Sequence, residues 1–106
     1  MAEDLTRYIK TLKCILEKAK EYPFLFDNNP IEFCENFVST DEIVRFYISK
    51  DHTGNLSLHF KEFNGGFTAP ETLEYLAEKA VNYKLSPEDL IRSFSRSIAV
   101  PLAKYN

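Results

Sequence analysis

The stretch EIVRFYISKDHTGNLSLHFKEF, residues 42–63, constrains the fold of this chain more than any other. Apolar and polar residues alternate on both sides of KDHTGN, a segment that contains Gly54. The apolar positions are Val44, Phe46, Ile48, Leu56, Leu58 and Phe60. Such alternation around a glycine-bearing turn predicts an antiparallel β-hairpin with one apolar and one polar face. A lone hairpin is marginally stable in water, so its apolar face must pack against helices or a second copy of the chain.

The segments before the hairpin have helical spacing. Residues 2–22 carry apolar side chains three and four positions apart, and Pro23 ends this predicted helix. Its apolar positions are Leu5, Tyr8, Ile9, Leu12, Ile15, Leu16 and Ala19. A second, shorter helix is predicted within residues 27–38, with Asn29 as its cap and Pro30 as its first residue. Its buried face would carry Ile31, Cys34 and either Phe37 or Val38, with Phe33 nearby.

Two more helices are predicted after the hairpin. Thr68 and Glu71 form a capping box for the first of them, and Ser86 opens the second with Asp89 at its third position. The inward positions would be Leu73, Leu76, Ala77, Ala80 and Val81 in one helix, and Leu90, Ile91, Phe94 and Ile98 in the other. Pro101 is expected to stop or kink the last helix.

The predicted order is helix, short helix, hairpin, helix, helix, which defines one small α+β domain over residues 1–106. With 44% hydrophobic residues, including nine phenylalanines, the chain can bury a core without a metal or a disulfide. The cysteines Cys14 and Cys34 are expected to be buried reduced thiols, with a disulfide as the alternative. No metal-ligand spacing and no phosphate-binding loop is present, so no cofactor is expected.

Charge and hydropathy indicate where the protein acts. Glu3, Asp4 and Arg7 interrupt any apolar run near the start, which argues against a signal peptide. No apolar run reaches the roughly 18 residues that a membrane span needs. We therefore expect a cytoplasmic protein with no membrane partner. The net charge of −3 lacks the basic excess of a typical nucleic-acid-binding domain.

The segment YPFLFDNNPIEFCENF, residues 22–37, combines five aromatic residues with acids and contains no lysine or arginine. Consecutive apolar residues at 24–26 cannot all face one way, so at least one aromatic is expected to be exposed beside acids. Exposed aromatics with a polar rim are typical of protein interfaces. The predicted partner-binding residues are Tyr22, Phe24, Phe26, Asp27, Glu32 and Glu35. The alternative is that this segment is a lid of buried rings.

The acids of this region support a narrower hypothesis. Residues 21–42 contain six acids and no basic residue, whereas residues 1–20 have a small basic excess. A compact acidic protein can occupy a basic groove that normally holds nucleic acid, as small inhibitors carried by viruses and plasmids do. The contacts would then be Glu32, Glu35, Asp41 and Glu42.

An enzyme is not expected. Nucleophilic catalysis needs a serine or cysteine held beside a base, and the sequence shows no such arrangement. His52 lies in the predicted turn, where a solvated role is the simpler interpretation. His59 falls on the polar face of the hairpin, where it could take part in anion binding or only in cross-strand pairs.

The C-terminal half suggests the alternative function. A strand followed by PETLEYLAEKA and LSPEDLIRSFSRS resembles the ribbon-helix-helix repressors, although NGGFTA separates the strand from the helix and a full hairpin is present. The resemblance implies a dimeric DNA-binding regulator whose strands enter the major groove. Its nucleic-acid-binding residues would be Arg45, Tyr47, His59, Lys61 and Ser86. The favoured hypothesis remains a self-associating, regulatory protein-binding module that forms homodimers and binds an unidentified protein partner.

Overall fold

The computed structural model describes residues 4–40, 42–62 and 71–105 of the chain. Three helices, one short 3-10 helix and three strands occur within these ranges. In chain order they are α1 (Thr6–Ala19), η1 (Pro23–Phe26), β1 (Ile31–Ser39), β2 (Glu42–Lys50), β3 (Leu56–Glu62), α2 (Leu73–Asn82) and α3 (Pro87–Ala103). The α+β fold class is therefore confirmed.

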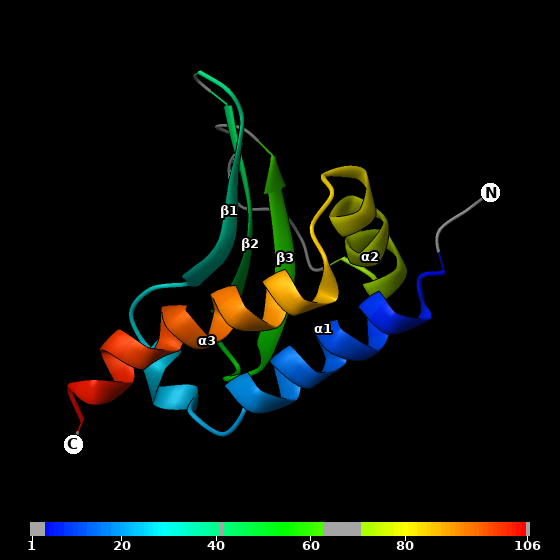
Figure 1. Cartoon of the computed structure of the whole chain (residues 1–106). Coiled ribbons are helices and arrows are strands. Elements are labelled where there is room, and N and C mark those ends of the chain that lie inside the picture. Colours follow the sequence, from blue (N-terminus) through cyan, green and yellow to red (C-terminus); the bar gives the residue numbers. More distant parts are fainter. Residues whose placement is uncertain (1–3, 41, 63–70, 106) are drawn as a thin grey trace.

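The strands form one antiparallel sheet in the order β1-β2-β3, and the helices gather on one side of it (Figure 1). The predicted hairpin is confirmed as β2 and β3, with Phe46 opposite Phe60 and Ile48 opposite Leu58. Its apolar face meets the helices in a single core that includes Leu12, Leu76, Leu90 and Phe94. Burial of these side chains contributes roughly 1.5–3 kcal/mol each, which is what holds the two layers together.

The helix predicted within residues 27–38 is wrong, because residues 31–39 form strand β1. Phe33 pairs with Phe46 of β2, and the two rings stack with their centres 5.8 Å apart. The cap signal at Asn29 and Pro30 was therefore overridden by this tertiary pairing. The apolar residues Ile31, Cys34 and Phe37 are also three positions apart in the sequence, as they would be on one face of a helix. Strand β1 contains an irregularity in this region, which is described below.

The termini of the other helices are set by local hydrogen bonds. The predicted start of α3 at Ser86 is confirmed, and Ser86 and Asp89 form a capping box there, with the Asp89 N–H donating to Ser86 Oγ over 3.1 Å. The predicted cap Thr68 lies outside the described residues. Helix α2 begins at Leu73, and the Tyr75 N–H donates to Thr72 Oγ1 over 3.1 Å. Helix α3 continues through Pro101 to Ala103, so Pro101 does not stop it.

Two residues of helices α1 and α3 that were expected to be buried are exposed. Cys14 lies on the open side of α1, so the prediction of a buried thiol there is wrong. Ile91 of α3 is 46% exposed, whereas Leu90, Phe94 and Ile98 point into the core as predicted. Cys34 is buried, and burial raises the pKa of its thiol to about 11. Neither cysteine is in a disulfide.

Candidate functional site

Strand β1 contains a bulge at Cys34. Phe33 pairs with Phe46 and Asn36 pairs with Val44, so two residues of β1 lie opposite Arg45 alone. The φ angle of Cys34 is 57°, in the left-handed region that favours glycine. Its backbone N–H donates to Ser93 Oγ of α3 over 2.6 Å. Helix α3 therefore supplies a hydrogen-bond partner at the point where the strand ladder is interrupted.

The bulge decides which way the rest of β1 faces. Beyond it, Asn36 lies opposite the fully buried Val44, and Phe37 lies opposite Ile43. Because side chains alternate along a strand, this register turns Phe37 away from the core. A second irregularity, between Phe37 and Ser39, leaves Val38 with no residue directly opposite. As a result Phe37 is 72% exposed and Val38 is 44% exposed.

Phe37 and Val38 belong to the last part of β1, and the β1–β2 hairpin extends beyond the helices (Figure 1). Glu35 is exposed and Glu42 is partly exposed, and neither forms an ion pair with any residue in the described ranges. Asp41 lies outside those ranges. We call Glu35, Phe37, Val38, Glu42 and Ile43 the hairpin-end patch. It is an apolar surface with an acidic rim.

The predicted partner-binding residues do not form one surface. Phe26 is buried in the core, and Tyr22 packs against that core. Phe24 is partly exposed, but its ring contacts Tyr105 near the C-terminus, with the ring centres 4.7 Å apart. Most of the aromatics at 22–26 thus act as the lid of rings considered above.

The acids of the predicted site also differ in their surroundings. Asp27 forms an ion pair with Lys50, and Glu32 forms one with Arg45 at 2.9 Å. Both charges are therefore largely balanced within the molecule. Of the six predicted residues, only Glu35 belongs to the hairpin-end patch.

Four of the five residues proposed for nucleic acid lie on the sheet face opposite the helices. Tyr47 pairs with His59 and Arg45 with Lys61 across β2 and β3. However, Tyr47 is 1% exposed and His59 is 4% exposed, and their rings stack 4.6 Å apart. Ser86, the fifth residue, caps α3 instead. Direct contact between a base and Tyr47 or His59 would therefore require this face to rearrange.

Ser49 of β2 is a polar neighbour of the stacked pair. Ser49 Oγ lies 3.1 Å from His59 Nε2, which brings a hydroxyl and an imidazole together. The buried position of His59 leaves no room for a substrate beside it in this arrangement. The arrangement thus resembles a structural hydrogen bond more than a nucleophile and its base. In the parts of the chain that the structure describes, no group of three metal-ligating side chains occurs.

No protein-family model matches the sequence, and no curated protein or solved structure is significantly similar to it. Within the described ranges, no helix is both long enough and apolar enough to cross a membrane. The candidate site therefore depends on geometry alone. The sequence pattern did not single out Phe37 and Val38 as exposed residues, because alternation along a regular strand does not reveal a bulge. The sequence signal for an unusual surface in this region was the absence of lysine and arginine from residues 21–42.

Proposed function

We propose that this protein is a non-enzymatic binding module that holds a protein partner through the hairpin-end patch. The observation that supports this proposal is the 72% exposure of Phe37, on a hairpin end whose carboxylates Glu35 and Glu42 form no ion pair within the described ranges. The other phenylalanines of the described ranges are buried, apart from the partly covered Phe24. An aromatic side chain left in water at a projecting position is typical of an interface centre.

The chemistry of the patch restricts the partner. Phe37 and Val38 need an apolar pocket, and Glu35 and Glu42 favour lysine or arginine around it. A protein that occupies a basic groove also blocks it. The proposed role is therefore regulatory or inhibitory. In the complex the apolar centre of the patch provides most of the affinity, and the acids orient the partner.

The test compares capture by three tagged proteins in the native host, with and without nuclease. They are the wild type, the double variant Phe37→Ser/Val38→Ser, and the matched control Val100→Ser, whose exposed fraction is 67%. We expect one stoichiometric protein to survive nuclease with the wild type and the control, and to be lost with the double variant. Recovery that nuclease abolishes, with DNA co-eluting, would instead support the DNA-binding alternative.

A fourth variant separates the two aromatic surfaces. Phe24→Ser removes the partly exposed ring beside Tyr105 and leaves the hairpin end intact. We expect it to retain the partner. If Phe24→Ser loses the partner and the double variant keeps it, the contact surface lies at residues 22–26 and the proposal is overturned.

A further inference from the structure

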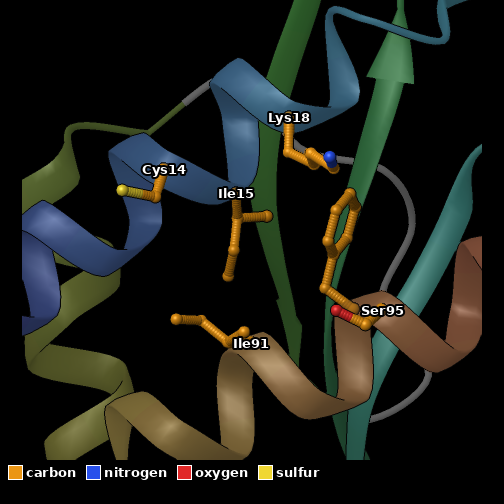
Figure 2. A pocket seen from close by; sticks show the side chains of 6 residues that line it. Cys14, Ile15, Lys18, Ile91 and Ser95 are labelled. Carbon is orange, nitrogen blue, oxygen red and sulfur yellow. The ribbon is translucent and has the colours of Figure 1, made fainter.

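The side of the helical layer formed by α1 and α3 contains two neighbouring hollows. One, of about 240 Å³, is lined by Cys14, Ile15, Lys18, Ile91, Phe94 and Ser95 (Figure 2). The other, of about 300 Å³, is lined by Arg7, Lys10, Thr11, Pro87, Glu88 and Ile91. Because Ile91 lines both, we treat them as one feature, the α1–α3 groove. The groove is lined by α1 and α3, whereas the hairpin-end patch is formed by residues of β1 and β2.

The α1–α3 groove has an apolar floor and a basic rim. Ile15 and Phe94 are buried beneath it, and the side chain of Ile91 is directed toward α1 (Figure 2). Lys10 forms no ion pair with any residue of the described ranges, and Lys18 is 3.9 Å from its nearest carboxylate. Arg7 is balanced by Glu88 at 2.7 Å. The groove thus offers what an apolar side chain flanked by carboxylates requires.

The hairpin-end patch has that complementary chemistry. It presents Phe37 and Val38 between Glu35 and Glu42, and it extends away from α1 and α3, so a chain cannot fill its own groove (Figure 1). We infer that the hairpin-end patch of one copy docks in the α1–α3 groove of a second copy. Phe37 lies against Ile91 and Phe94 in this contact, and the carboxylates face Lys10 and Lys18.

The inference rests on the proposed function, since it uses the same patch and names a second copy of the chain as one of its partners. It also predicts the form of the assembly. Two different surfaces meet, so a docked pair retains one free groove on the copy that used its patch and one free patch on the other copy. The mean mass therefore grows with concentration instead of stopping at a dimer. A symmetric pairing of two hairpins would stop at two copies.

The experiment measures mass by sedimentation at several concentrations for two complementary variants. Phe37→Ser lacks the patch and keeps the groove, whereas Ile91→Glu keeps the patch and disables the groove. Each variant alone is expected to remain a monomer. An equimolar mixture is expected to form a dimer of one copy of each, because one intact patch meets one intact groove. Far-ultraviolet circular dichroism verifies that both variants are folded.

Two controls and one further variant complete the test. Val100→Ser and Arg96→Glu alter exposed residues that do not line the groove, and both are expected to assemble like the wild type. Lys10→Glu/Lys18→Glu leaves the apolar floor intact and is expected to weaken assembly by about tenfold or more, as does raised salt. This charge variant keeps the inference testable if Ile91→Glu fails to fold.

Three results overturn the inference: a wild type that is monomeric at high concentration, an Ile91→Glu variant that still assembles, or a mixture that stays monomeric. A wild type that stops at a dimer and depends on Phe37 but not on Ile91 would indicate symmetric hairpin pairing. If the wild type is monomeric but loses its captured partner with Phe37→Ser, the inference fails and the proposed function stands.

Discussion

Two aromatic segments lie close together in the sequence and have opposite surroundings in the molecule. At η1, Phe26 is buried, Tyr22 packs against the core, and Phe24 is partly covered by Tyr105. At the hairpin end, Phe37 is 72% exposed. Both segments are aromatic and have acids in or directly beside them, so composition does not explain the difference. The difference in exposure comes from what packs over each segment. Helix α3 continues past Pro101, and Tyr105 beyond it packs on Phe24 of η1, whereas the hairpin extends beyond the helices (Figure 1).

The largest expected effect tests the covered segment. Phe26→Ala should lower the free energy of unfolding by about 3–5 kcal/mol, because it leaves a cavity in the core. Urea denaturation measures this change. Val100→Ala, at an exposed site of α3, should stay within about 0.5 kcal/mol of the wild type. If Phe26→Ala changed the free energy of unfolding as little as the control does, η1 would not be part of the core. The contrast between η1 and the hairpin end would then be lost.

The next effect tests how α3 holds the hairpin. Ser93→Ala removes the acceptor of the Cys34 N–H and leaves a part-buried donor without its partner. We expect a loss of about 1–3 kcal/mol in unfolding free energy, with faster amide exchange at residues 34–39 than at β3. The matched control is Ser95→Ala, an exposed serine two residues along the same helix. If Ser93→Ala and Ser95→Ala had the same unfolding free energy and the same amide exchange rates at residues 34–39, α3 would not hold the bulge in place.

A smaller effect concerns the start of α3, the helix that both segments contact. Hydrogen bonds from Ser86 hold the pKa of Asp89 below its ordinary value of 3.8. A carboxyl with a lowered folded-state pKa stabilises the protein above the unfolded pKa, and this contribution disappears as pH falls through the folded-state value. Asp89→Asn should therefore flatten the loss of Tm below about pH 4, as scanning calorimetry would show.

The control for this pH dependence is Glu78→Gln, at an exposed position of α2 that forms no ion pair within the described ranges. It should follow the wild-type curve of Tm against pH. If Asp89→Asn follows that curve as well, the capping box does not contribute to acid sensitivity.

The smallest effect on stability is expected at the hairpin end. Phe37→Ser and Val38→Ser each replace a side chain that is mostly in water, so the free energy of unfolding should change by no more than about 0.5 kcal/mol. Urea denaturation in the same series measures it. A loss of several kcal/mol would mean that these side chains belong to a folded core, and the comparison between the two segments would no longer hold.

Much of the fold could be predicted from the sequence, because regular periodicity reports regular structure. The hairpin, α1 and the Ser86 capping box each follow from a local pattern, and each is present. Strand β1 could not be predicted in this way. Ile31, Cys34 and Phe37 are three residues apart in the sequence, which is helical spacing, and only pairing with β2 shows the strand and its bulge.

The candidate site was predicted less well for a related reason. Whether an aromatic residue is core or surface depends on the register of its strand, and Phe37 changes sides because of one additional residue. Ile91 was likewise assigned to the core by its helical spacing. It lies instead at the border of two helices, in the α1–α3 groove. Periodicity identifies the apolar side of a helix or strand, but it does not show which residues of that side are covered by neighbouring elements.

The bulge at Cys34 also bears on how this protein could change through insertions and deletions. Because two residues share one opposite position, removal of Glu35 would leave the pairs Phe33–Phe46 and Asn36–Val44 in place. Removal of a residue of β1 away from its two irregularities would transpose every side chain beyond it. At the Cys34 bulge the chain can shorten and lose a rim acid while Phe37 keeps its orientation. Affinity could thus be adjusted by length alone, without a substitution at the apolar centre.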